Sequence, residues 1–397
     1  MFLAYFAGIS LTLSSFTQLR VNGIGPGELM IVLSIFGALG TIFVRNRIVK
    51  PRRLLIYIAV ALSASVLGLI TVAFKAPDAP SFPTWGRQYF AINLAIVFPI
   101  LISISVGHER LKHTLKFFSI STILIYGLTY LFVIMKVEKI FTVPLMYGED
   151  RFIGLSENPN QTAFAIGIAV VFLTHSLLVG EISKKFGIPL ILLGAITGLA
   201  TSSNALQVTL ALTMSMALLG NQSVRQNLEK QRYFKILKSL RIMFGFSAVL
   251  GGLLWIFFNS EDIYAGKGAG ASEGEGAVRL GLWYNAIQAW SSAPFLGHGP
   301  GHFSGFSGPF EEVEAHNTIL DWLTSYGAIG ALCLMLLIFS TAFQLIRQKQ
   351  YSMGSLLISI IMFSSFHFLG RIPLFWLCLF YCYQMTAKKS VFGEKKT

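Results

Sequence analysis

The sequence predicts an all-α membrane protein of about twelve transmembrane helices, with a helical loop domain between the ninth and the tenth. Three observations support this fold class. Hydrophobic residues make up 54% of the 397-residue chain. Charged residues make up only 12%, whereas a soluble domain has about 25%. Apolar stretches of about 20 residues, the length that crosses a bilayer, recur along the chain.

Twelve apolar stretches are expected to span the membrane: residues 2–19, 28–44, 54–74, 88–106, 117–135, 160–180, 186–202, 204–220, 242–259, 317–343, 352–369 and 373–386. The first has no basic residue ahead of it and no clear cleavage site, so we expect a retained helix rather than a signal peptide. The predicted domains are 1–259 with nine spans, 260–316 as the outer loop, and 317–397 with three spans and a tail.

The basic residues predict the orientation of these spans. When loops are assigned alternately to the two sides, one side carries 22 of the 31 Lys and Arg residues. This bias is typical of cytoplasmic loops, and it places both termini in the cytoplasm. A nucleic-acid-binding protein would instead gather its basic residues on one accessible face. The net charge of +13 therefore does not indicate a nucleic-acid partner.

The outer loop 260–316 is longer than the topology requires. It opens with a glycine-rich run at 266–276, continues with a helical segment at 278–290, and has a second glycine-rich region at 297–308. Loops of this length are usually functional or disordered. A second unusual feature is the polar break at 201–204 between the seventh and eighth spans, which is tolerated at membrane depth only inside protein or beside a cavity.

The first motif that can carry chemistry surrounds the start of the sixth span. Asn158 followed by Pro159 is typical of an N-cap and a first helical residue. A helix N-terminus attracts anions, and Arg151 can fold back over that end with Asn160 as a supporting residue. Arginine pairs with phosphate through a bidentate fork. The alternative is an interfacial arginine beside acidic neighbours.

The second motif is the helical segment of the outer loop. At 100° per residue, Trp283 and Trp290 lie within about 40° of Arg279. A face with one cation and two indoles fits the membrane interface, where Arg279 would lie near a lipid headgroup. The alternative is an amphipathic surface helix without chemistry.

The third motif directly precedes the tenth span. His316 has the residue type of a general base, with a reference pKa near 6.5. We expect nearby carboxylates, Glu314 among them, to favour its charged form and orient its ring. Asn317 is expected to cap the following helix. Asp321, one turn later, is expected to face the bundle and support His316, because a lipid-exposed carboxylate is costly.

Weaker candidates lie elsewhere on the outer side. Arg371 at an outer boundary can join the site. His298 and His302 are too few for a zinc site, which takes three or four ligands, so no metal is expected. His367 falls inside the eleventh apolar stretch and is expected to be a packed side chain.

The charge bias alone places the three motifs on one side of the membrane. Two arginines and a base suit transfer from a lipid diphosphate, because the arginines neutralise the leaving group and the base takes a proton from the attacking hydroxyl. Nucleotide sugars are absent outside the cytoplasm, so a lipid-borne donor is the natural one.

These motifs resemble those of the O-antigen ligase and polymerase superfamily. The resemblance rests on Arg151 with Asn158-Pro159-Asn160, on Arg279 with Trp283 and residues 294–301, and on Ala315-His316-Asn317 with Gly327 and Gly330. It implies an integral-membrane glycosyltransferase of the GT-C-like class in a bacterial inner membrane. Such an enzyme inverts the anomeric centre and needs no metal or other cofactor.

The resemblance also implies partners and roles. The donor would be a glycan on undecaprenyl diphosphate, and the acceptor would be lipid A-core or a second lipid-linked glycan. Arg151 and Arg279 match the diphosphate-binding arginines of the superfamily, and His316 matches the histidine that activates the acceptor. One position departs, because many members have an arginine where this chain has Asn204.

Two alternatives remain open on the sequence. A polymerase would share the donor and base with a ligase, so the motifs do not separate them. A transporter or flippase would place its ionisable residues near the bilayer midplane, whereas these three motifs fall at the outer boundary.

Overall fold

The computed structural model describes residues 1–21, 24–45, 55–73, 82–148, 150–220, 275–302 and 313–387. The expected ninth span, 242–259, lies outside the described residues, as does nearly all of the glycine-rich run 266–276.

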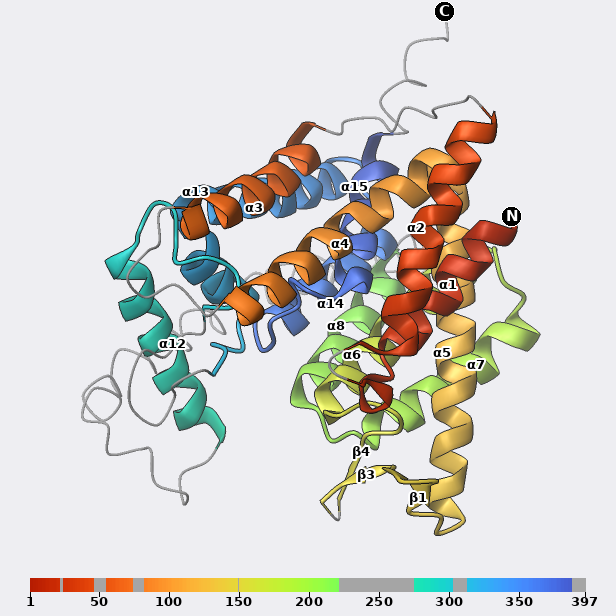
Figure 1. Ribbon diagram of the computed structural model, residues 1–397. Helices are drawn as coiled ribbons and strands as arrows, with labels where there is room; N and C mark the ends of the chain where they lie inside the picture. Colours follow the sequence, from red (N-terminus) through yellow and green to blue (C-terminus); the bar gives the residue numbers. More distant parts are fainter. Residues whose placement is uncertain are drawn as a thin grey trace, which may run out of the picture.

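Twelve α-helices make up most of the described part of the chain (Figure 1). They are α1 Phe2–Ser14, α2 Pro26–Arg45, α3 Leu55–Ala73, α4 Phe82–Val106, α5 Leu111–Ile134, α6 Pro159–Leu178, α7 Lys184–Leu199, α8 Asn204–Gly220, α12 Glu275–Ser292, α13 Thr318–Arg347, α14 Tyr351–Ser364 and α15 Pro373–Ala387. Eleven of them coincide with predicted spans, and α12 coincides with the predicted helical segment of the outer loop. Short 3₁₀ turns follow α1 at Thr17–Leu19 and precede α5 at His108–Arg110.

Among the described residues, five helices are long and apolar enough to cross a membrane, namely α2, α4, α5, α6 and α13. Three more, α1, α3 and α14, are apolar but shorter. A helical fold with several such segments is that of a multi-pass membrane protein. The total of twelve spans and the extent of the outer domain remain predictions.

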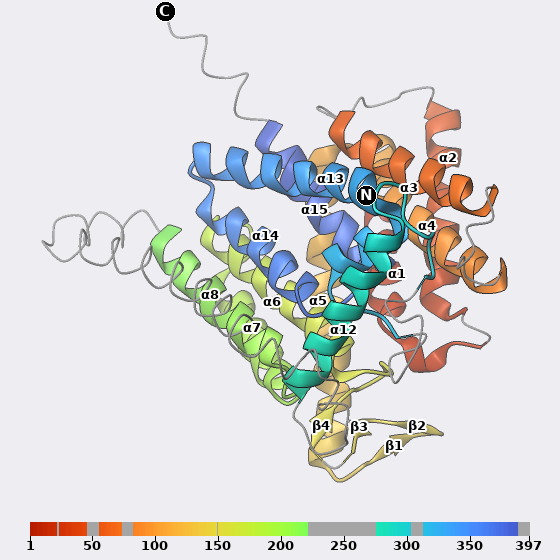
Figure 2. The same ribbon diagram turned by 90° about the vertical axis from the view of Figure 1, so that its left-hand side faces the viewer.

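Two small antiparallel hairpins lie beyond the end of α5, and the sequence did not predict them. The first pairs β1 (Lys139–Ile140) with β2 (Val143–Pro144), and the second pairs β3 (Met146–Tyr147) with β4 (Arg151–Phe152). Figures 1 and 2 both place the hairpins at the lower edge of the molecule. They matter because β4 carries Arg151.

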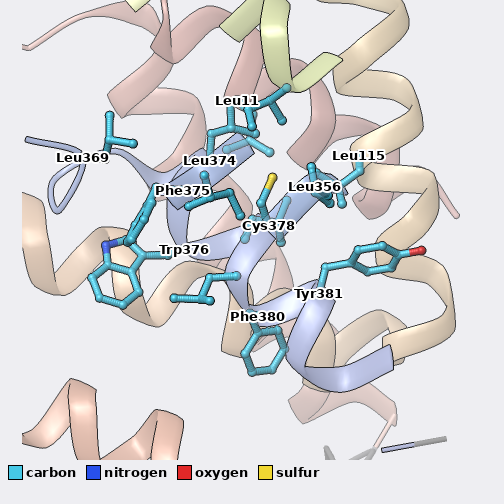
Figure 3. Packing of buried hydrophobic residues seen from close by; sticks show 14 of the residues in the cluster. Leu11, Leu115, Leu356, Leu369, Leu374, Phe375, Trp376, Cys378, Phe380 and Tyr381 are labelled. Carbon is cyan, nitrogen blue, oxygen red and sulfur yellow. The ribbon is translucent and has the colours of Figure 1, made fainter. Parts of the chain in front are cut away.

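The core is built around α6 and α15. Almost every side chain from Leu374 to Tyr383 on α15 is fully buried, and so are those from Ala163 to Leu173 on α6. Figure 3 shows that apolar side chains of α15, Trp376, Cys378 and Phe380 among them, point to different sides of the helix. A helix that is apolar on every side is expected at the centre of a membrane bundle.

Helix α13, which coincides with the tenth predicted span, is broken by a glycine. Gly327 has φ +62° and ψ −168°, a conformation essentially restricted to glycine. The segment 294–299 lies against the break and satisfies backbone groups that the helix leaves open, as is required away from water. Four hydrogen bonds join them: His298 N–H to Thr324 O (2.8 Å), Gly299 N–H to Ser325 O (2.9 Å), Ala328 N–H to Pro294 O (2.8 Å) and Ile329 N–H to Phe295 O (3.3 Å).

Helix α14, which coincides with the eleventh predicted span, ends earlier than predicted. The sequence placed residues 352–369 in one span, whereas α14 ends at Ser364. The hydroxyls of Ser364 and Ser365 donate back to Ile361 O, at 2.8 and 2.9 Å. Such bonds compete with helix continuation. The expectation that His367 lies inside a span was therefore wrong, because it belongs to the loop 365–372.

Candidate active site

Arg151 is held over the start of α6, as the sequence predicted. Asn158 caps the helix by accepting a bond from Asn160 N–H at 2.8 Å, and Pro159 is the first helical residue. The Arg151 guanidinium donates to Asn160 Oδ1 at 3.2 Å and to Thr201 O at 3.1 Å. The guanidinium thus joins the N-terminal end of α6 to the turn between α7 and α8.

Arg151 and Arg279 line the same small cavity, of about 270 Å³. The described residues that line it include no carboxylate. The starts of α6 and α8 both border it, through Asn160 and through Asn204 with Ala205. Two guanidinium groups and two helix N-termini make the cavity suited to an anion. The complete lining is Arg151, Asn160, Ser202, Ser203, Asn204, Ala205, Arg279, Phe366 and His367.

Arg279 reaches this cavity from α12. Its guanidinium carbon lies 5.5 Å from the centre of the Phe366 ring, a distance at which a cation is attracted to the ring face. Trp283 is half-buried on the same helix but lines neither this cavity nor the larger one. Trp290 donates to Pro294 O at 2.9 Å, so it fastens α12 to the segment 294–299.

His316 stands directly before α13 in a strained conformation. Its φ is +51°, which is uncommon for a residue with a side chain. The buried Asp321 carboxyl group accepts hydrogen bonds from the N–H groups of the two residues that flank His316, Ala315 at 2.8 Å and Asn317 at 3.3 Å. Asn317 caps α13 by accepting from Ile319 and Leu320 N–H, as predicted. Asp321 therefore fixes the backbone on which the imidazole is carried.

His316 opens into a second, larger cavity of about 520 Å³. Two of the predicted supporting residues, Glu314 and Arg371, line this cavity and form an ion pair with each other. The other charged residues on its wall are Arg20, Glu28, Arg87 and Glu157. The apolar residues that line it between α1, α2, α4 and α6 include Leu11, Ile31, Leu94 and Phe164.

His367 is the residue that sequence reasoning missed. It lines both cavities, as does Asn160, so the two cavities adjoin. Its ring centre lies 6.3 Å from that of His316. The signal that could have found it is its place at the outer end of the eleventh span, four residues before Arg371.

The electrostatics of the two histidines differ from the prediction. Burial lowers the pKa of His316, and Arg279 and Arg371 lower it further, whereas Glu314 acts in the opposite direction. The expectation that a nearby carboxylate favours the charged imidazole is confirmed for Glu314, but burial and the two arginines outweigh it, so the net effect lowers the pKa. Burial lowers the pKa of His367 to about 3, with further lowering by His316, Arg279 and Arg151. Both rings are neutral at pH 7 when the cavities hold no anion.

The pair His298 and His302 lies elsewhere. Their rings are stacked with centres 4.3 Å apart, and His298 Nε2 lies 2.9 Å from Ser292 Oγ and 2.8 Å from Ala289 O. Neither lines the two cavities. The described residues contain no group of three or more His, Cys, Asp or Glu side chains that could hold a metal ion.

A comparison with protein families finds a similarity over part of the chain. Residues 188–335 match the family model described as O-antigen ligase. Over these residues the chain is similar to the O-antigen ligase family. Arg279 and His316 lie inside the region that matches the O-antigen ligase family, whereas Arg151 and His367 lie outside it. Among curated proteins, none matches this chain.

Proposed function

We propose that this O-antigen ligase homologue transfers a glycan from undecaprenyl diphosphate to a hydroxyl of lipid A-core, with inversion and without a metal. The observation that supports this most directly is the pair of adjoining cavities, one with Arg151 and Arg279 and the other with His316. The first suits a diphosphate, and the second suits the acceptor.

The smaller cavity would stabilise the leaving group. As the bond between the anomeric carbon and the diphosphate oxygen breaks, negative charge gathers on the diphosphate. Arg151 and Arg279 neutralise that charge with fixed positive groups, and the N–H groups at the starts of α6 and α8 add partial positive charge. Arg151 does not have to rearrange far, because it is already bonded to Thr201 and Asn160.

His316 would activate the acceptor. An acceptor hydroxyl in the larger cavity gives its proton to the neutral imidazole, and its oxygen attacks the anomeric carbon from the side opposite the diphosphate. The new glycosidic bond forms as the old bond breaks, so the anomeric configuration inverts. The lowered pKa of His316 keeps the imidazole in its basic form at neutral pH.

Polymerisation is the second candidate function. The larger cavity combines charged residues with apolar ones deeper between the helices. That combination suits an acceptor sugar attached to a lipid, which describes a second lipid-linked repeat unit as well as lipid A-core. Donor and base are the same in both reactions.

The orientation is part of the proposal. Both termini would be cytoplasmic and the site periplasmic in a bacterial inner membrane, since the basic residues are concentrated on one set of loops. The lipid-linked substrates would then reach the cavities from the outer leaflet. The surrounding bilayer lipids are the other expected partners.

Substitutions at the two cavities test the reaction. In an assay with purified protein and undecaprenyl-diphosphate glycan, Arg279→Ala should lower transfer by roughly 100-fold or more, and His316→Ala by roughly 100- to 10,000-fold. Lys139→Gln, which removes an exposed cation on β1, is the control and should transfer normally. Undiminished transfer by both site variants would reject the assignment.

A deletion strain separates the two candidate reactions. Lipopolysaccharide gels that show bare core, together with accumulated lipid-linked polymer, indicate a ligase. Single capped repeats indicate a polymerase. A normal pattern argues against both.

A further inference from the structure

We propose that His367 is a further ligand of the donor's diphosphate, which takes up a proton when the diphosphate binds and then donates an N–H hydrogen bond to it. This inference rests on the proposed function, since it requires a diphosphate in the smaller cavity. It adds a third group to that cavity, from a loop outside the region that matches the family.

The first argument is position. His367 shares the smaller cavity with Arg151 and Arg279, and it shares the larger one with His316. A group on the wall between the two cavities adjoins the place where the diphosphate leaves and the acceptor attacks. Its ring is at a tilt of 68° to the His316 ring, with 6.3 Å between centres, so the two imidazoles are neighbours without being stacked.

The second argument is that His367 is firmly held. Thr318 Oγ1 donates to His367 O at 2.6 Å and accepts from Leu369 N–H at 3.0 Å. Asn317 Nδ2 donates to Ser365 O at 3.2 Å. These bonds join the loop 365–372 to the first residues of α13, next to His316. The ion pair between Arg371 and Glu314 also joins the loop 365–372 to the residues just before α13. The backbone that carries His367 is therefore fastened to the backbone that carries His316.

The third argument is charge. Burial, His316, Arg279 and Arg151 hold the pKa of His367 near 3, so the ring is neutral in the empty site. A neutral imidazole offers one N–H and one lone pair. The other charged groups around the larger cavity are Glu314 and Arg371, which are paired, and Glu157, Arg87, Arg20 and Glu28.

A bound diphosphate reverses this balance. At an effective dielectric constant of about 20, one negative charge about 4 Å away raises a pKa by about 3. A diphosphate linked at both ends carries two negative charges, so His367 becomes protonated near neutral pH. The proton comes from solvent and forms the second N–H bond of the imidazole, and no bond of the diphosphate breaks in this step. During transfer the electron pair of the broken bond stays on the diphosphate, and the hydroxyl proton goes to His316.

Calorimetry measures this proton directly. The full chain in lipid nanodiscs is titrated with a short-chain prenyl diphosphosugar, whose diphosphate is esterified at both ends and keeps the same charge over the tested range. Titrations in two buffers of different ionisation enthalpy, at several values from about pH 5 to about 8, give the number of protons bound. The variants are His367→Gln, His367→Asn and His316→Gln, with His113→Gln as a control that lines neither cavity.

The wild type is expected to take up close to one proton per probe. Its affinity should then fall as the pH rises, by up to about tenfold per pH unit, which is the slope for one linked proton. Both His367 variants should lose most of the uptake and most of the slope, while His113→Gln behaves as wild type. Binding that Arg279→Ala abolishes would show that the probe occupies the arginine cavity.

Two results would overturn the role of His367 and leave the proposed function intact. One is binding that depends on Arg279 but has the same proton uptake in both His367 variants as in wild type. The other is loss of the uptake in His316→Gln alone, which would assign the proton to His316. A wild-type protein that fails to bind the probe at all would overturn the proposed function together with the inference.

Discussion

The glycine at the break in α13 offers a demanding test of the structure. A methyl group added at Gly327 would lie 2.2 Å from Phe295 O and 2.3 Å from Phe295 C. The backbone of the segment 294–299 must therefore move by roughly 1 Å to restore van der Waals contact. We predict that Gly327→Ala destabilises the protein and impairs transfer, although the residue lines neither cavity.

The magnitude follows from two contributions. Forcing a side chain into the conformation of Gly327 costs about 1–3 kcal/mol. The shift also breaks the bonds from Ala328 to Pro294 O and from Ile329 to Phe295 O, each with a net value of about 0.5–1.5 kcal/mol. The loss of stability is therefore about 2–6 kcal/mol. Because Trp290 couples this segment to α12, the Arg279 guanidinium should be displaced, and a misplacement of about 1 Å can cost about 100-fold in rate.

The assay compares melting temperature at one fixed scan rate with glycan transfer by the purified protein. Gly40→Ala is the matched control, because a methyl group there meets nothing within 4 Å inside α2. Alanine in a helix interior is better than glycine by about 0.5–1 kcal/mol, so the control should melt no lower than wild type. Wild-type melting and transfer by Gly327→Ala would refute the description of the break.

Three further predictions concern the site. Arg371→Gln removes a cation that lowers the pKa of His316, and it releases Glu314, a carboxylate that raises that pKa. The acid limb of the kcat/KM profile should therefore move to higher pH, and an unmoved limb would contradict this. Asn204→Arg adds a guanidinium to the smaller cavity. Binding of the prenyl diphosphosugar should tighten by about tenfold or more, since hydrogen bonds to charged groups contribute about 1.5–3 kcal/mol, and weaker binding in calorimetry would argue against an anion there. Transfer should persist in excess EDTA, and its loss would direct attention to His298 and His302.

Much of the bundle could be predicted because membrane helices are defined by length and apolarity. The N-caps at Asn158 and Asn317 were also accessible, since both depend on residues within four positions in sequence. Arg151, Arg279 and His316 line adjoining cavities, whereas their side of the membrane stays a prediction from the charge bias.

What the sequence could not give depends on contacts between distant segments. Apolar residues continue after Ser364-Ser365 at Phe366, Phe368 and Leu369, so the end of α14 at Ser364 could not be predicted from hydropathy. His367 joins the site only because Thr318 and Asn317 hold its loop. The lowered pKa of His316 likewise depends on distant segments, because it comes first from burial and then from Arg279, 37 positions earlier in the chain, and Arg371, 55 positions later.

The contact between α13 and the segment 294–299 is made by main-chain hydrogen bonds. The four bonds between them use only N–H and C=O groups. Every residue supplies the C=O, and every residue except proline supplies the N–H. Apart from the glycines at 297, 299 and 327, which have positive φ, the donors and acceptors of these four bonds do not depend on the identity of the side chains. Substitutions in the walls of the two cavities can therefore change which substrates fit, while the backbone bonds that hold α13 and the segment 294–299 together stay the same.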